Sequence, residues 1–94
     1  MSYRLIYSST SGKQIGSLHP WIKPTIKKHI EDLKENPFSG KALEKELSGY
    51  YSLRAKRFRV IYEIKDQEKI IQVHYVGYRK DIYQLLRELL EDKQ

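Results

Sequence analysis

The chain has 94 residues, of which 39% are hydrophobic and 32% are charged, so we expect one folded domain over residues 1–94 without a separate cofactor domain. It contains no cysteine, which excludes disulfide bonds, thiolate zinc sites and cysteine nucleophiles. The formal net charge is +6, and such an excess of cations favours a polyanion or an acidic protein as partner. No apolar run reaches the ~18 residues of a membrane span, and the N-terminus lacks the apolar core of a signal peptide. We therefore expect a cytoplasmic protein that makes no membrane contact.

The beginning of the chain predicts a strand and a short helix. Residues 3–8 alternate apolar and polar side chains, which is typical of a strand. Hydroxyl side chains follow at residues 8–11, and they favour a helix cap or a turn because they accept hydrogen bonds from free backbone N–H groups. A short helix that carries Ile15 and Leu18 on its apolar side is expected next.

A second helix is expected to begin between Pro20 and Pro24, since proline is tolerated in the first helical turn. It should end at residues 36–37, Asn-Pro, because the residue before a proline avoids the helical region. Its apolar stripe has helical spacing and consists of Ile22, Ile26, Ile30 and Leu33. Trp21 is predicted to pack between the two helices, with contact to a protein partner as the alternative.

From residue 50 onward the period of the apolar residues changes from about 3.6 to 2, which indicates strands. The first strand contains Tyr51 and Leu53 and ends in a tight turn near residues 55–56. The residues predicted to face the core from the second and third strands are Phe58, Val60, Tyr62, Ile64, Ile71, Val73 and Tyr75. An apolar repeat over residues 82–90 predicts a terminal amphipathic helix. The order β-α-α-β-β-β-α predicts an α+β fold.

The basic residues gather around the predicted strands. Residues 54–59 contain four cations and no acid, and Arg79 and Lys80 come to lie beside them if the last two strands pair as a hairpin. Tyrosines are expected near the rim of the same face, namely Tyr50, Tyr51, Tyr78 and Tyr83. Cations bind phosphates and aromatic rings stack on bases, so this face is a candidate RNA surface. The alternative is an ordinary solvated strand face.

Three sequence blocks carry a resemblance to a known family. They are LSGYYSLR at residues 47–54, FRVIYEI at 58–64 and VGYRKDIY at 76–83, preceded by a helix that ends in Glu-Asn-Pro at 35–37. Together they resemble the toxin family of RelE and ParE over nearly the whole chain. The resemblance implies a RelE-like fold, in which a helical hairpin packs on a curved, mainly antiparallel sheet with a C-terminal helix. It also implies the toxin of a type II toxin–antitoxin pair.

The resemblance implies functional roles for individual residues. Those in catalytic positions are Arg59, Arg79 and Tyr83. The clustering of cations and tyrosines, not the resemblance, is the reason to expect RNA and ribosome binding at Arg54, Lys56, Arg57, Tyr78 and Lys80. His74 is a candidate general base because the pKa of an unperturbed imidazole lies near neutrality. The chain departs from the family where Tyr78 replaces a common His or Lys, and where Tyr50 and Ser52 replace two lysines of some members.

Alternatives remain at the level of single residues and of the whole protein. Arg59 could form a salt bridge with Glu63, which lies on the same strand, and Tyr83 could stack on a base or pack under the helix instead of moving a proton. The RelE branch comprises ribosome-dependent endoribonucleases that cut mRNA, whereas the ParE branch poisons DNA gyrase. A third alternative is an inactive toxin fold that only binds its antitoxin.

The partners and cofactors follow from this interpretation. We expect a cognate antitoxin that is acidic and partly disordered, together with the ribosome and mRNA, and contact with DNA only through the antitoxin complex. No cofactor is expected. No metal site is expected either, because the histidines at positions 19, 29 and 74 lack the spacing of metal ligands and no carboxylate cluster accompanies them.

Overall fold

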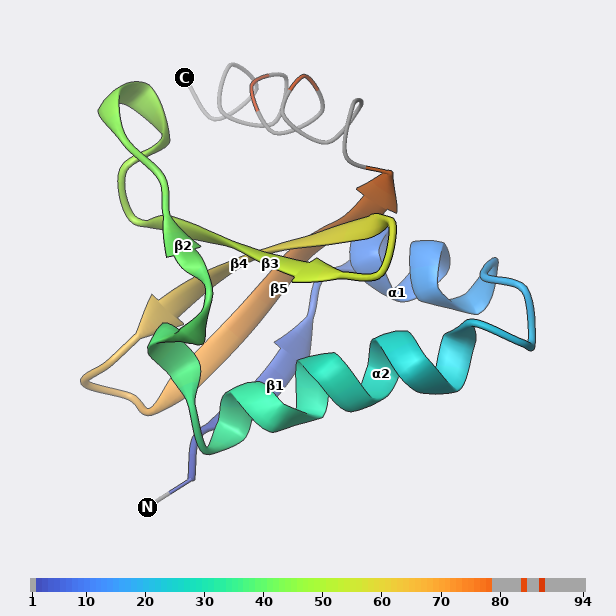
Figure 1. Ribbon diagram of the computed structural model, residues 1–94. Coiled ribbons are helices and arrows are strands. Elements are labelled where there is room, and N and C mark those ends of the chain that lie inside the picture. The colour runs from blue at the N-terminus through green and yellow to red at the C-terminus, as the bar shows by residue number, and fades with distance from the viewer. Residues whose placement is uncertain (1, 79–83, 85–86, 88–94) are drawn as a thin grey trace.

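The computed structural model describes residues 2–78, 84 and 87, and a five-stranded sheet forms its centre (Figure 1). The strands are β1 (Arg4–Tyr7), β2 (Lys41–Ala42), β3 (Tyr50–Ala55), β4 (Phe58–Lys65) and β5 (Ile70–Tyr78). Their order is β1-β5-β4-β3-β2, with β1 parallel to β5 and all other neighbours antiparallel. The prediction of an α+β fold with a mainly antiparallel sheet is confirmed. Strand β2 was not predicted, since two residues are too few to show a period.

Two helices, α1 (Ser9–Gly16) and α2 (Lys23–Glu31), lie on one side of this sheet (Figure 1). Ser8 caps α1, because its Oγ accepts a hydrogen bond from the Ser11 N–H at 3.0 Å. Helix α2 carries Pro24 in its first turn, as predicted, and is followed by a 3-10 turn, η1 (Asp32–Lys34). Two more 3-10 turns, η2 (Pro37–Ser39) and η3 (Lys45–Leu47), belong to the connector that leads to β3.

The apolar face of α2 holds the helices on the sheet. Ile26, Ile30 and Leu33 of the predicted stripe are fully buried, and Ile22 is partly buried. Burial of one such side chain contributes roughly 1.5–3 kcal/mol. The main buried cluster between helices and sheet consists of Ile15, Ile26, Ile30, Ala55, Val60, Val73 and Val76. The helical stripe that the sequence predicts is therefore part of the core.

A β-bulge in β5 changes which of its side chains face the helices. The register of β4 and β5 shifts between Ile61 and Tyr62, where β5 contains one extra residue, His74. After this insertion Val76 faces the helix-side core, whereas Tyr75 lies on the opposite face as the partner of Ile61. Tyr75 is buried, as predicted, but it lies on the face of the sheet opposite α1 and α2, because strict alternation does not continue past an extra residue.

Helix α1 and its cap residue Ser8 provide side chains that bind the backbone of β5 at this bulge. An inserted residue disrupts the ladder of a sheet locally and leaves backbone groups that need other partners. The hydrogen bonds are Ser8 Oγ to the His74 carbonyl at 3.0 Å, Ser11 Oγ to the Val73 carbonyl at 2.8 Å, and the Val76 N–H to Gln14 Oε1 at 2.7 Å. These bonds explain why Ser11 is fully buried, and they fix α1 against β5.

Trp21 lies in the loop between α1 and α2 and is 81% exposed. The prediction that it packs between the helices is wrong. Its backbone N–H donates to His19 Nδ1 at 3.2 Å, and the apolar contacts of this region are made by its neighbour Ile22 instead. The single tryptophan of the chain is thus a surface residue.

Only Gln84 and Arg87 are described in the segment for which a terminal helix was predicted, and both are helical. Arg87 Nε lies 3.9 Å from Glu46 Oε1 in the connector. The other residues of 82–90 lie outside the described residues. Within the described part of the chain, no helix is both long enough and apolar enough to cross a membrane.

Candidate nucleic-acid interface

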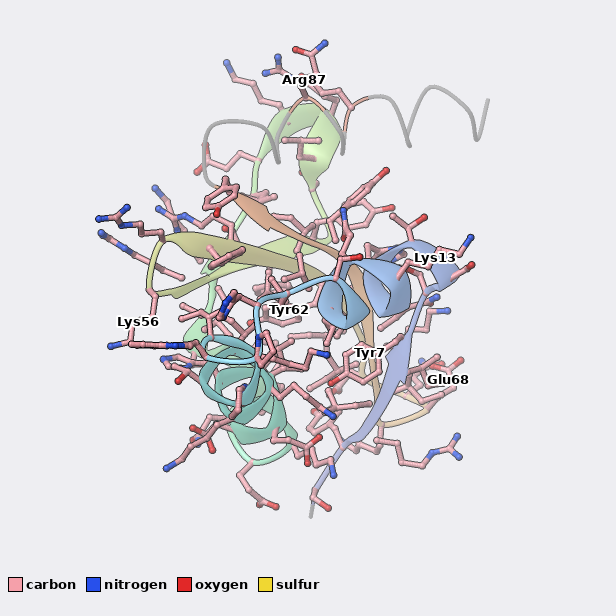
Figure 2. The ribbon with its side chains drawn as sticks, turned by 90° about the vertical axis from the view of Figure 1, so that its right-hand side faces the viewer. Tyr7, Lys13, Lys56, Tyr62, Glu68 and Arg87 are labelled. Carbon is pink, nitrogen blue, oxygen red and sulfur yellow. The ribbon has the colours of Figure 1, made fainter. Side chains whose placement is uncertain are left out.

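The turn between β3 and β4 gathers four cations at one end of the sheet. Arg54 and Arg59 are direct cross-strand partners, so their side chains leave the same face. Lys56 and Arg57 form the two-residue turn between the strands, and Figure 2 shows Lys56 pointing away from the body of the molecule. The structure thus brings together Arg54, Lys56, Arg57 and Arg59, which we call the turn cations.

Within the described residues, no acid neutralises the charges of the turn cations. Among the residues that the structure describes, no carboxylate oxygen lies within 4.0 Å of any of the four. Like charges directly opposite each other on two strands are destabilising, so the pair formed by Arg54 and Arg59 costs free energy in the isolated chain. A bound anion would remove that cost.

A hollow of about 210 Å³ lies between these side chains. It is lined by the turn cations and by Phe58, whose ring is half-buried. A planar guanidinium donates two parallel hydrogen bonds to phosphate oxygens. The geometry and the charge of the hollow therefore suit a phosphate group of a nucleic acid.

Glu63 does not pair with Arg59, although that pairing was one interpretation of the sequence. Its Oε1 lies 3.1 Å from Nε2 of His74 instead. His74 is only 7% exposed, and its ring meets that of Tyr50 edge to face at 5.2 Å. A buried imidazole held by a carboxylate and a tyrosine favours a structural role over that of a general base. Among the described residues, Arg59 has no ion-pair partner.

Tyr78 occupies the other side of the same sheet end. Its ring stacks on Phe58 with the centroids 4.7 Å apart, and the side chain is 56% exposed. Phe58 and Tyr78 are cross-strand partners on the helix side of the sheet. Arg59 follows Phe58 on β4, so its side chain leaves the opposite face. Tyr50 and Tyr51 do not form an exposed rim, because Tyr50 is buried and Tyr51 stacks on the buried Tyr62.

Three of the residues predicted for the site, Arg79, Lys80 and Tyr83, lie outside the described residues. In the described part of the chain no three His, Asp or Glu side chains come together as a metal site would require. Phe58 was missed as a site residue, since its place in an alternating strand indicates only a core position. Its position between two cationic residues, Arg57 and Arg59, was the available signal.

Comparison with known proteins gives concordant results. The family model described as "ParE toxin of type II toxin-antitoxin system, parDE" matches residues 5–83. Toxin RelG of Mycobacterium tuberculosis is 31% identical over 85 residues, which cover 88% of this chain and 98% of RelG.

Solved structures show the same fold. The chain is similar to one in the toxin–antitoxin complex RelBE2 of Mycobacterium tuberculosis, with a TM-score of 0.77, 27% identity, and coverage of 84% of this chain and 100% of that one. A mutant of the E. coli toxin RelE in the free state, in which two arginines are replaced by alanine, has a TM-score of 0.75 at 20% identity, with 89% and 93% of the two chains covered. At 20% identity, the similarity to the E. coli RelE mutant is evidence for the fold alone.

Proposed function

The chain belongs to the RelE/ParE family of toxins of type II toxin–antitoxin systems, and from this premise we propose that it is a ribosome-dependent endoribonuclease that cleaves mRNA. The observation that carries the proposal is the hollow formed by the turn cations, in which Arg54 and Arg59 are cross-strand partners and no acid of the described residues pairs with them. That hollow offers a site for the phosphate of an RNA backbone.

The proposed chemistry is metal-independent attack of a ribose 2′-OH on the adjacent phosphate. Arg59 binds the phosphate through two parallel hydrogen bonds and stabilises the negative charge that develops in the pentavalent transition state. By resemblance to the family, Arg79 stabilises the side of the leaving 5′ oxygen, and Tyr83 takes part in proton transfer. The ribosome contributes by holding the RNA in a reactive geometry, which compensates for the weak acid–base groups of the toxin.

We propose a cognate antitoxin, the ribosome and mRNA as partners in the cytoplasm. Similar structures include complexes with an antitoxin, such as RelBE2 of Mycobacterium tuberculosis and the archaeal RelE–RelB complex of Pyrococcus horikoshii. With a net charge of +6, this chain suits an antitoxin segment that is acidic and partly disordered and that folds on binding. Contact with DNA would then occur only through the antitoxin complex.

A second candidate function is favoured by the family model itself, which describes ParE toxins. In this alternative the protein inhibits DNA gyrase by binding and cleaves nothing. An inactive toxin fold that only binds its antitoxin is the third candidate. These candidates differ in whether RNA is cut and in whether supercoiling is blocked.

Two assays in parallel test the proposal. Primer extension on mRNA in a translating extract should show cuts that require ribosomes, whereas a gyrase supercoiling assay should show no inhibition. Arg59→Ala should reduce the single-turnover cleavage rate by ~10²–10³-fold, as for the loss of one preorganised donor to a developing anion. Its fold should stay intact, because Arg59 is partly exposed and forms no ion pair with the described residues.

The matched control is Lys27→Ala, an exposed cation on α2, which should cleave at the wild-type rate. The nuclease proposal would be wrong if a folded Arg59→Ala/Arg79→Ala double variant arrested growth as well as the wild type. Toxicity would then arise from binding alone, and inhibition of gyrase would become the better explanation.

A further inference from the structure

A groove runs along α1 beside the end of the sheet that carries the turn cations. Its volume is about 560 Å³, which lies within the range of small-molecule sites. One wall consists of Lys13 and Leu18 with the following His19, and the other is formed by Phe58, Val76 and Tyr78. The groove therefore lies between α1 and the adjoining ends of β4 and β5.

The walls of this groove are fixed before anything binds. Gln14, which lines the groove, accepts a hydrogen bond from the Val76 N–H at 2.7 Å, and Ser11 holds α1 on the Val73 carbonyl at 2.8 Å. On the opposite wall Tyr78 stacks on Phe58. Preformed walls lower the cost of binding, since little has to be ordered when a ligand arrives.

The chemistry of the groove combines an apolar, aromatic floor with positive charge at its edge. Lys13 is exposed at the edge (Figure 2), and His19 is exposed next to it. No acidic residue is among the described residues that line the groove. A ligand that fits this combination has a flat apolar part and a negative charge, which is the composition of a nucleotide.

Phe58 connects the groove to the hollow between the turn cations, because its side chain lines both. A chain of phosphates bound at Arg54 and Arg59 could pass around Phe58 and place a neighbouring nucleotide in the groove. The exposed side of the Tyr78 ring is then a surface on which its base can stack. This continuity favours RNA over a protein segment as occupant.

We propose that the groove between α1 and the ends of β4 and β5 is a second RNA subsite, which binds a nucleotide next to the scissile phosphate. The base stacks on Tyr78 and Lys13 contacts the phosphate. The inference rests on the proposed function, since it takes RNA as the substrate held by the turn cations. Tyr78 and Lys13 position the RNA, whereas the cleavage itself is assigned to Arg59, Arg79 and Tyr83.

Single-turnover cleavage of mRNA on programmed ribosomes, with the toxin in excess, tests the subsite. Tyr78→Ala should raise the half-saturating toxin concentration by roughly fivefold to a hundredfold, the range expected for the loss of one base–aromatic stack, with a smaller effect on the maximal rate. Tyr78→Phe keeps the ring and should restore wild-type behaviour. Lys13→Ala should raise the same concentration and weaken its dependence on salt, whereas Lys27→Ala should leave it unchanged.

A photo-crosslink gives a readout independent of activity. mRNA that carries 5-iodouridine on either side of the cleavage position, with a 2′-O-methyl group at the attacking ribose, should crosslink to the peptide that contains Tyr78. If the wild type cuts no RNA but forms this crosslink, the proposed cleavage fails and the subsite stands.

Three results would overturn the subsite. The first is that the wild type cleaves RNA, but the half-saturating concentrations of the Tyr78→Ala and Lys13→Ala variants equal that of the Lys27→Ala control. The second is crosslinking that reaches only the β3–β4 turn. The third is that both variants cleave normally but escape neutralisation by the antitoxin, which would assign the groove to a protein segment.

Discussion

At the scale of single residues, the hydroxyl of Tyr62 joins the connector to the sheet. It donates to the Pro37 carbonyl at 2.8 Å and accepts from the Gly40 N–H at 3.0 Å, at a side chain with no exposed area. We predict that Tyr62→Phe lowers the free energy of unfolding by about 1–3 kcal/mol, because two backbone groups lose their partner. Urea denaturation measures the change. Tyr51→Phe, at the half-buried tyrosine stacked on Tyr62, is the control and should cost less than about 0.5 kcal/mol.

The same variant has a signature at alkaline pH. Burial raises the pKa of Tyr62 to about 12 from the ordinary value of 10.0, so the unfolded chain loses this proton at a lower pH than the folded chain does. Stability is therefore fully present below pH 10 and falls between about pH 10 and 12. Tyr62→Phe should make this part of the stability curve shallower. Equal slopes in both proteins would show that the hydroxyl is not protected from ionisation. The stability of Tyr62→Phe should still fall somewhat with rising pH, because burial also raises the pKa of Tyr7.

At the scale of elements, the β3–β4 turn contains backbone strain at a cationic residue. Lys56 has a φ of 58°, which lies in the left-handed region where side chains other than glycine cost roughly 1–2 kcal/mol. We predict that Lys56→Gly raises the thermal midpoint of unfolding and at the same time weakens binding to RNA or ribosomes. The two effects should separate in calorimetry and in a binding assay. Lys45→Gly, at a φ of 56° in η3, should stabilise the fold without a change in RNA binding. If Lys56→Gly bound as well as the wild type, the strained residue would have no role in binding.

The bulge in β5 shows where sequence patterns stop being informative. Alternation correctly predicted that β4 and β5 are strands and that Val60 and Val73 face the core. It could not predict the extra residue at His74, because a bulge adds no unusual side chain to the sequence. As a result Val76, and not Tyr75, joins the core beneath the helices, and Tyr75 is buried on the opposite face. The serines and Gln14 that bind this part of β5 come from α1 and its cap, and contacts between elements so far apart in sequence leave no local signal.

At the scale of the whole molecule, the element order and the helix-side core follow from the sequence, whereas the arrangement of the site follows only in part. Clustered charge indicated the turn cations, since four cations within six residues must lie close together in any strand–turn–strand. The groove was not predicted, because its two walls meet only through the parallel pairing of β1 with β5 that places α1 beside the strand ends. Tyr78 belongs to that groove, on the opposite side of the sheet from Arg59.

Net charge and local charge make different predictions for binding. A triple Arg54→Gln/Lys56→Gln/Arg57→Gln variant and a triple Lys27→Gln/Lys28→Gln/Lys41→Gln variant each lose three exposed cations from a chain of charge +6. If the turn cations contact phosphates, only the first variant should show a weaker salt dependence of affinity for single-stranded RNA. The slope of log affinity against log salt should then decrease by about 2, since each lost contact with a single strand contributes ~0.7. Fluorescence anisotropy of a labelled RNA, measured over a range of roughly 50 to 300 mM KCl, gives both slopes. Equal losses in the two variants would mean that RNA responds to the overall charge of the molecule, and the turn cations would not be a binding site.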